Sequence, residues 1–261
     1  MKIKEVLYAL EEFAPLPLQE DYDNVGLQVG LTETEVSGAL LCLDVTEEVI
    51  DEAIMKKCNL IVSHHPLVFR ALKRVADENM VQRCVMKAII NGITIISMHT
   101  NLDNAVGGVN YKIAQKLGLC NLQILDPKNV AGIEGGSGVI GMLPQPIGAR
   151  EFVDIVKSTF HVECVQANHL LERKIQKVAL CGGAGAFLLG KAVKEGADAF
   201  ITGEMHYHEF FGMEQQIQIC VIGHYQSEQY TNEILKSIIE EKCKGVRCCL
   251  TDTCTNPIIY L

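Results

Sequence analysis

The chain has 261 residues, of which 48% are hydrophobic and 21% are charged, a balance typical of globular proteins. Its formal net charge is -9 and it has no run rich in lysine or arginine, so nucleic-acid binding through a broad basic face is disfavoured. No apolar run approaches the ~18 residues that a membrane span needs, and no membrane partner is expected. The 11 cysteines, without a secretion signal, favour reduced thiols and a cytoplasmic location.

The first half of the chain alternates between predicted helices and short buried strands. Asp44 is expected to cap the helix that follows the first strand, since Glu47 stands at capping-box spacing. Such alternation predicts a largely parallel sheet with helices on its faces and ligand sites beyond the carboxyl ends of its strands. The expected helices are residues 3–13, 45–57, 81–90 and 107–117, and the expected strands are residues 39–43, 60–62 and 93–96.

Near Asp126 the pattern changes to a glycine-rich stretch, which suggests a second lobe. The elements expected after it are strands 138–143, near Cys164, 178–181 and 199–202, helices 149–159 and 187–195, and then strand 219–222, helix 227–242 and strand 246–250. The predicted fold is therefore α/β, with two α/β lobes of layered sheet and flanking helices. Residues 1–126 plus 219–261 would form a discontinuous metal-binding lobe, and residues 127–218 a second lobe inserted in the first.

Three stretches with metal-ligand side chains each follow a predicted strand. They are Ser63-His64-His65-Pro66, His99-Thr100-Asn101-Leu102-Asp103 and His224-Tyr225-Gln226-Ser227-Glu228. Together they offer four histidines and two carboxylates. Such a set is sufficient for two divalent cations side by side, an arrangement that activates water.

Each stretch by itself also has a plainer interpretation. His64 and His65 are adjacent in extended backbone and point in opposite directions, which suits two neighbouring ions or two residues that end a strand. Asp103 offers a hard oxygen ligand or caps the next helix. His224 and Glu228 lie one turn apart on a helix face, where a glutamate also suits the helix N-terminus.

Three further segments leave alternatives open. The glycine-rich stretch 181–185 could expose N–H groups to phosphate, but a tight turn is favoured. The stretch 204–208 has two interpretations. It either supplies groups that support metal ligands or substrate, with His208 as a proton shuttle, or it is a polar loop. The role of His206 stays open. Four cysteines near the C-terminus lack C-x-x-C spacing, which favours buried structural thiols: Cys243, Cys248, Cys249 and Cys254.

Four segments, in order along nearly the whole chain, resemble the motifs of the NIF-three-like family, also catalogued as GTP cyclohydrolase 1 type 2 homologues. They are Tyr22-Asp23-Asn24-Val25-Gly26-Leu27-Gln28, Ser63-His64-His65-Pro66, His99-Thr100-Asn101-Leu102-Asp103 and Gly223-His224-Tyr225-Gln226-Ser227-Glu228. Tyr22 stands where many members carry tryptophan. Some members are longer through a domain inserted in mid-chain, for which this chain is too short.

The resemblance implies a ring-shaped homohexamer and a dinuclear centre of two divalent metal ions per chain, either Zn, Fe or Mn. It implies His99 as a nearby catalytic acid, base or orienting group, and as metal ligands His64, His65, Asp103, His224 and Glu228, the last touching both ions. The expected function is metal-dependent, GTP cyclohydrolase-like hydrolysis of a small anionic or nucleotide-like substrate. The alternative is a non-catalytic metal-binding scaffold or regulatory protein that binds a protein partner or ligand.

Overall fold

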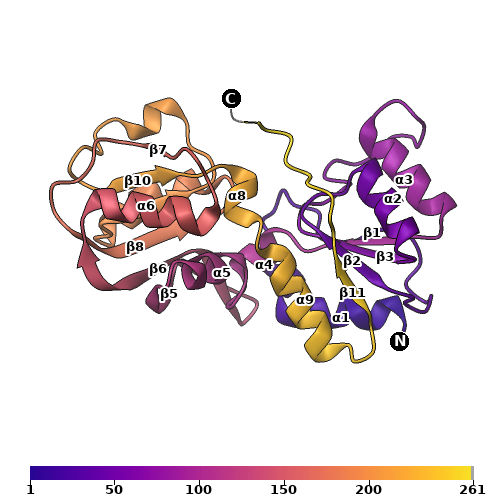
Figure 1. Ribbon diagram of the computed structural model, residues 1–261. Helices are drawn as coiled ribbons and strands as arrows, with labels where there is room; N and C mark the ends of the chain where they lie inside the picture. Colours follow the sequence, from indigo (N-terminus) through magenta and orange to yellow (C-terminus); the bar gives the residue numbers. More distant parts are fainter. Residues whose placement is uncertain (260–261) are drawn as a thin grey trace. The chain divides into compact units, whose positions relative to one another are not determined.

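The computed structural model describes residues 1–259 and divides the chain into two compact units. Unit 1 combines Met1–Leu102 with Thr231–Leu261, and unit 2 is Asp103–Tyr230, inserted between the two parts of unit 1 (Figure 1). The prediction of two α/β lobes, one inserted in the other, is confirmed. The unit boundaries differ from the expected ones: the segments 103–126 and 219–230, expected in the first lobe, belong to the inserted unit.

Unit 1 is built on a five-stranded sheet with the order β1-β4-β3-β2-β11. The strands β2, β3, β4 and β11 run parallel, and β1 is antiparallel to β4. Every residue of β2, β3 and β4 is buried, as expected for a parallel sheet covered on both faces. The bounds are β1 Gly26–Val29, β2 Ala39–Cys42, β3 Leu60–Ser63, β4 Thr94–Ser97 and β11 Cys248–Leu250.

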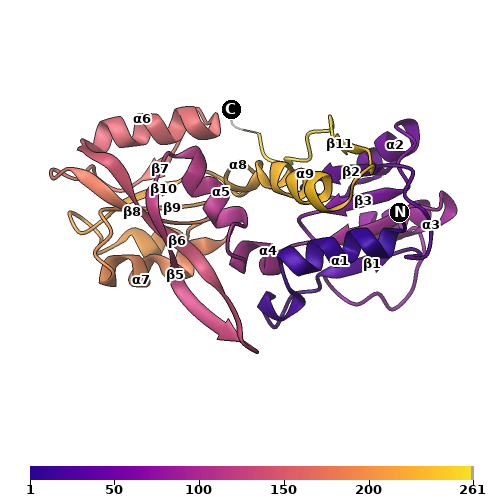
Figure 2. The ribbon, with the colours of Figure 1, turned by 90° about the horizontal axis from the view of Figure 1, so that it is seen from below.

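Two pairs of helices cover this sheet (Figures 1 and 2). One face is covered by α1 (Ile3–Phe13) and α9 (Thr231–Lys242), and the other by α2 (Glu47–Met55) and α3 (Met80–Ile90). A single 3-10 turn, η1, spans Leu16–Leu18. The helices therefore leave the carboxyl ends of the parallel strands as the edge where loop side chains can gather.

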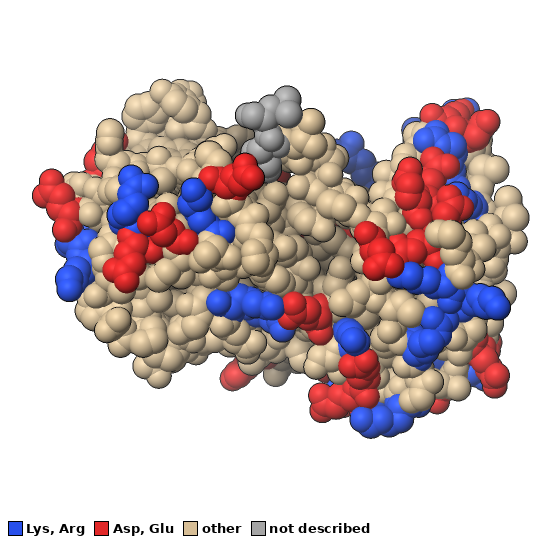
Figure 3. Space-filling view, in the orientation of Figure 1, with Lys and Arg blue, Asp and Glu red and all other residues tan. Residues whose placement is uncertain are grey.

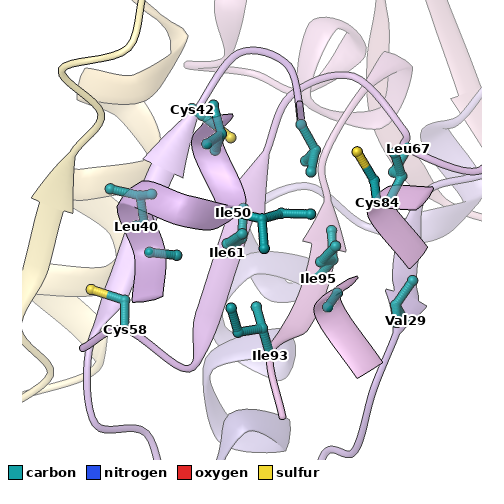
Figure 4. Packing of buried hydrophobic residues seen from close by; sticks show 14 of the residues in the cluster. Val29, Leu40, Cys42, Ile50, Cys58, Ile61, Leu67, Cys84, Ile93 and Ile95 are labelled. Carbon is teal, nitrogen blue, oxygen red and sulfur yellow. The ribbon is translucent and has the colours of Figure 1, made fainter. Parts of the chain in front are cut away.

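The core between the sheet and the α2–α3 pair is packed from neighbouring strands in register (Figure 4). Leu40, Ile61 and Ile95 lie side by side on β2, β3 and β4, and all three are fully buried. Ile50 of α2 and Cys84 of α3 pack in the same cluster. Burial of each large aliphatic side chain contributes about 1.5–3 kcal/mol, so this core fixes the strand ends firmly.

Unit 2 contains a six-stranded sheet with the order β5-β6-β8-β9-β10-β7 (Figure 2). The strands β8, β9 and β10 are parallel, and the other neighbours are antiparallel. The strand bounds are β5 Cys120–Val130, β6 Ile133–Ile147, β7 Gln166–Ala167, β8 Ile175–Cys181, β9 Ala199–Thr202 and β10 Gln218–Val221. The helices are α4 Thr100–Asn104, which spans the unit boundary, α5 Val109–Lys116, α6 Ala149–Phe160, α7 Leu189–Lys194 and α8 His224–Glu228, with 3-10 turns η2 Gly185–Leu188 and η3 Tyr207–Phe210.

Several elements differ from the sequence-based expectation, which did not include β1 or α4. β10 was expected in the first lobe, but it pairs with β9 in the sheet of unit 2. β5 was not expected as a strand, and Pro127 is tolerated there because β5 is at the edge of its sheet. The expected helix 227–242 is instead two helices, α8 and α9, separated by residues 229–230.

The described surface carries mixed charge. On the face drawn in Figure 3, lysines and arginines lie interspersed with aspartates and glutamates. Lys2 and Glu33 form an ion pair of 2.8 Å, and Lys242 and Glu12 another of 2.8 Å. All 11 cysteines lie in the described part of the chain, where they are free thiols. Among the described helices, none is both long and apolar enough to cross a membrane.

Candidate metal centre

Three histidines meet at the carboxyl edge of the sheet in unit 1. His64 and His65 follow β3, and His99 follows β4, the parallel neighbour of β3. Because parallel strands end at the same edge, the two loops bring the rings together. Each of the three side chains offers a nitrogen, and these nitrogens all lie within 4.8 Å of one another. This group could hold a metal ion.

Each of these rings is held at Nδ1 by an oxygen that can only accept a hydrogen bond. The acceptors are the carbonyl oxygen of Met98 for His64 at 2.8 Å, Oδ1 of Asp44 for His65 at 2.7 Å, and Oδ1 of Asp23 for His99 at 2.8 Å. In the neutral imidazole the proton is therefore on Nδ1, and Nε2 carries the lone pair that a metal ion would need. Metal-binding histidines are usually oriented in this way, so the residues present fit a metal ion.

Asp23, which holds His99, is itself firmly fixed in the loop before β1. Its Oδ2 accepts hydrogen bonds from the N–H of Thr100 at 3.0 Å and from the Thr100 hydroxyl. Its Oδ1 also accepts from the N–H of Asn24 at 2.8 Å. Burial alone would raise the pKa of Asp23, but the hydrogen bonds from His99 and Thr100 outweigh it and lower the pKa to about 2. Asp23 is therefore a charged acceptor at neutral pH.

Asp44 does not cap α2, contrary to the sequence-based prediction. The N-cap is Thr46, whose side chain accepts from the N–H of Val49 at 3.3 Å. Asp44 instead accepts from His65 at Oδ1 and from the hydroxyl of Thr255 at Oδ2, each at 2.7 Å. Burial alone would raise the pKa of Asp44, but the hydrogen bond and charge of His65 and the hydrogen bond from Thr255 hold it below its usual range.

A second set of candidate ligands lies in unit 2. Asp103 belongs to α4, and His224 and Glu228 open and close α8, one turn apart as expected. Oε2 of Glu228 lies 3.2 Å from Nε2 of His224, and a Glu228 oxygen lies within 4.8 Å of an Asp103 oxygen. Nδ1 of His224 faces Oε1 of Glu204 at 3.0 Å. This histidine is thus oriented by a carboxylate in the same way as His65 and His99.

The glycine-rich stretch 181–185 is a tight turn between β8 and η2, as favoured from the sequence. Gly183 has φ +58°, a conformation that side chains rarely adopt. A Cβ atom at this position would come within 2.3 Å of Oε1 of Glu228. The N–H of Gly183 donates to the hydroxyl of Ser227 at 2.9 Å. The turn therefore packs its backbone directly against the Glu228 carboxylate.

The polar segment after β9 contributes one group to the second set and leaves the others outside it. Glu204 holds His224 and also lines a pocket of about 450 Å³, together with His206 and Phe187. His208 lies in η3, where its ring contacts Tyr207 at a centroid distance of 5.2 Å. The interpretation of Glu204 as a group supporting a ligand thus has a structural basis, whereas His208 packs in an aromatic cluster.

The four C-terminal cysteines belong to no candidate metal group in the part of the chain that the structure describes. Among the described residues, the groups of side chains close enough to hold an ion contain no cysteine. Cys243 is buried, Cys248 and Cys249 are half-buried, and Cys254 is exposed, so the expectation of buried thiols holds only in part. Burial raises the pKa of Cys248 to about 11.

The fold and these side chains define a class of protein: two α/β units with histidines and carboxylates suited to divalent metal ions. The family model for Duf34/NIF3 (NGG1p interacting factor 3) matches residues 1–257, and the chain belongs to this family. A curated relative from Clostridium acetobutylicum, named GTP cyclohydrolase 1 type 2 homolog, is 36% identical over 230 residues, which are 87% of this chain and 85% of that protein.

Two other comparisons agree with this assignment. NIF3-like protein 1 of Drosophila melanogaster is 31% identical over 252 residues, covering 93% of this chain and 84% of that protein. The crystal structure of a Bacillus cereus protein related to NIF3 matches with a TM-score of 0.90 and 25% identity, covering 100% of this chain and 99% of the other. The resemblance and the fold class expected from the sequence are therefore confirmed, while the assignment of individual ligands stays a prediction.

Proposed function

We propose that this protein is a dinuclear metal-dependent hydrolase of small anionic or nucleotide-like substrates. The observation that supports it most directly is the shared anchoring of four histidines: His64, His65, His99 and His224 each have Nδ1 against an oxygen acceptor. Anchoring at Nδ1 by an oxygen acceptor is typical of metal-binding histidines. Imidazole and carboxylate donors suit Zn, Fe or Mn.

The proposed ligands follow the family motifs. They are His64, His65, Asp103, His224 and Glu228, with Glu228 shared by two ions. The ions would act as Lewis acids that make water a nucleophile near neutral pH.

The protein's own residues then have distinct tasks. Asp44 and Glu204 hold Nδ1 of His65 and His224 and would so direct Nε2 toward a metal ion. His99, oriented by Asp23, would position the attacking water or transfer a proton, with the acidic partner setting its tautomer. Its two neighbours in the candidate metal group, His64 and His65, also make it a candidate ligand, so its role needs an experiment.

Charge supports an anionic substrate. Two divalent ions carry more positive charge than Asp103, Glu228 and one hydroxide neutralise, so an anion bound directly to the ions would be attracted. Asp23, Asp44 and Glu204 face Nδ1 of the imidazoles and not Nε2, which would face the ions. The name GTP cyclohydrolase 1 type 2 homolog belongs to relatives of this chain. It makes GTP the first substrate to test. The pocket beside Glu204 offers about 450 Å³ for part of such a molecule.

Assembly and location belong to the same proposal. From the family resemblance we infer a homohexamer, without a nucleic-acid or membrane partner. The 11 free thiols support a reducing, cytoplasmic environment.

The proposal is tested by a substrate screen of the metal-loaded protein. Protein loaded with Zn²⁺, Mn²⁺ or Fe²⁺ is assayed against nucleotides, phosphoesters and amides, beside Glu228→Gln and the exposed control Glu195→Gln. We expect turnover of one substrate class by wild type and Glu195→Gln. We expect Glu228→Gln to lose turnover and to hold less of both ions. Tight uptake of metal with no turnover in any class would instead favour a non-catalytic scaffold or regulatory protein.

A further inference from the structure

Residues 251–259 continue from the end of β11 beyond the sheet of unit 1, without further helix or strand (Figure 1). β11 is parallel to β2, and the N–H of Thr251 continues their pairing by donating to the carbonyl of Leu41 at 3.0 Å. The chain after β11 therefore leaves the sheet at the same edge as the loop after β2, which carries Asp44. This places residues from the two ends of the sequence beside each other.

Glu52 of α2 fastens this tail. It accepts from the hydroxyl of Thr251 at 2.5 Å and from that of Thr253 at 2.7 Å. It also accepts from the N–H of Asp252 at 2.8 Å and from Lys56 at 2.6 Å. Glu52 is only 5% exposed. The path of the tail is therefore fixed two residues before it reaches Asp44.

The tail places the hydroxyl of Thr255 against Asp44, the carboxylate that orients the candidate metal ligand His65. The Thr255 hydroxyl donates to Oδ2 of Asp44, while Oδ1 of Asp44 accepts from His65. With both oxygens engaged, the plane of the Asp44 carboxylate is set, and with it the direction of the imidazole. The Asp44 side chain is 35% exposed, so without Thr255 water would compete for Oδ2.

The same arrangement occurs once more in unit 1. Asp23 accepts from His99 at one oxygen and from the Thr100 hydroxyl at the other. Both carboxylates thus lie between a threonine hydroxyl and an imidazole. The two arrangements differ in where the threonine lies in the sequence. Thr100 directly follows His99, whereas Thr255 belongs to the C-terminal tail, 211 residues from Asp44. Only the second arrangement depends on docking of the C-terminal tail.

We infer that the C-terminal tail is a working part of the metal centre, in which Thr255 positions Asp44 and Asp44 in turn positions His65 for a divalent ion. This inference rests on the proposed metal-binding function and extends it to a residue outside the ligand set. Thr255 is a positioning residue: it acts through Asp44 and does not contact the ion. The tail then contributes to metal affinity through the Thr255 hydroxyl, because its hydrogen bond to Asp44 stabilises the ligand geometry that the ion requires.

The test measures the affinity of the full-length protein for Zn²⁺ by competition with a chromogenic chelator. Thr255→Val removes the hydroxyl and keeps the shape, and Thr255→Ser restores the hydroxyl. We expect Thr255→Val to weaken the affinity of one ion about 2- to 10-fold, the equivalent of one hydrogen bond. Thr255→Ser should bind like wild type. Asp44→Ala should weaken binding about 10- to 100-fold, as is usual for the outer partner of a metal-binding histidine.

Two further variants separate positioning from general stability. Thr253→Val removes a tail hydroxyl that bonds Glu52 and not Asp44, so it should lower the stability of the metal-free protein more than it changes Zn²⁺ affinity. In the Asp44→Ala background, Thr255→Val should have no further effect on affinity, because its action passes through Asp44. Equal losses of affinity in Thr253→Val and Thr255→Val, or additive losses in the double variant, would overturn the inference.

The inference and the proposed function fail in different ways. Wild-type protein that binds Zn²⁺, with an affinity that Thr255→Val leaves unchanged, would overturn the inference alone. Wild-type protein that takes up no Zn²⁺ would overturn the proposed function and the inference with it.

Discussion

At the scale of single residues, the feature that sets this site apart is the partner of each imidazole. Asp44, Asp23 and Glu204 each occupy one Nδ1 and so direct one Nε2. The partner of His64 is instead a backbone carbonyl, which cannot change its charge. The carboxylate partners hold the imidazoles in a fixed orientation, which benefits metal binding and proton transfer alike. His99 therefore has two candidate roles, as a metal ligand and as a group that orients water or transfers a proton.

The role of His99 can be decided by His99→Ala. If His99 orients water or transfers a proton, the variant keeps its metal and its oligomeric state, and turnover falls about 10²- to 10⁴-fold. Metal content by elemental analysis and turnover of the substrate found in the screen are measured side by side. His208→Ala is the matched control, because His208 lies in η3 outside both ligand sets.

The other outcomes assign His99 differently. Loss of metal in step with activity would make it a ligand, in keeping with its position beside His64 and His65. Unchanged turnover with a modest loss of stability would make it a structural residue that anchors Asp23.

At the scale of secondary structure elements, two connections shape the surroundings of the candidate ligands. The turn from β8 to η2 presses its backbone against Glu228, and the tail after β11 reaches Asp44. Neither connection supplies a ligand. Each instead limits the movement of an element that carries a ligand. A change in either connection should therefore lower metal affinity by displacing a ligand, without removing a donor atom.

Gly183→Ala tests the first connection. The new methyl group would come within 2.3 Å of the Glu228 carboxylate and should displace it, lowering metal uptake. Gly196→Ala is a matched control, since Gly196 has a similar φ of +69° and no neighbour within 4 Å of the new Cβ. Both variants carry a backbone strain of about 1–3 kcal/mol. Metal uptake and thermal unfolding are measured for both, and equal loss of metal in the two would contradict a specific contact at Gly183.

The second connection gives a pH-dependent contribution to stability through Glu52. Burial alone would raise the pKa of Glu52, but the hydrogen bonds from Lys56, Thr251 and Thr253 lower it from 4.5 to about 2. A carboxyl group with a depressed pKa stabilises the folded state above its unfolded pKa. This contribution is then lost as the pH falls from about 4.5 to about 2.

Glu52→Gln should therefore destabilise the protein most at neutral pH, by about 1.5–3 kcal/mol, the range for hydrogen bonds to a charged group. The difference in unfolding free energy from wild type should shrink between about pH 5 and about pH 3. Urea denaturation at several pH values measures it, with the exposed Glu35→Gln as control. A difference that stays constant over this range would show that the charge of Glu52 does not fasten the tail.

At the scale of the whole molecule, the chain divides its candidate ligands between two units. His64, His65 and His99 belong to unit 1, and Asp103, His224 and Glu228 to unit 2. The boundaries of the inserted unit, after Leu102 and after Tyr230, fall within a few residues of Asp103 and Glu228. Asp103 and Glu228 therefore lie close in sequence to residues of unit 1 as well as unit 2.

Assembly is the prediction that belongs to this scale. Light scattering with size-exclusion chromatography at micromolar concentration should give about six times the chain mass of 28.7 kDa, as the family resemblance implies. A single species at the chain mass would contradict a closed oligomer. Repeating the measurement after removal of metal by a chelator shows whether assembly depends on the ions.

Local patterns in the sequence were sufficient for much of the fold and for the choice of candidate ligands. The spacing of apolar residues within α1, α3 and β9 predicts each of these elements from its own residues. His64 and His99 each follow a strand end, which predicts that they lie at an edge of a sheet. The family motifs add the grouping of distant segments. The element patterns depend on neighbouring residues only, and the grouping of the motifs comes from the family resemblance.

Only the tertiary structure decided which partners these segments take. A short apolar strand such as β10 carries no signal for its neighbour, and it joins β9 instead of the first sheet. Asp44 fits helix-cap spacing, yet it bonds His65 and Thr255, the latter 211 residues away. Asp23 meets His99 across 76 residues. The partner of a loop carboxylate depends on where other strands end in space, which no local pattern records.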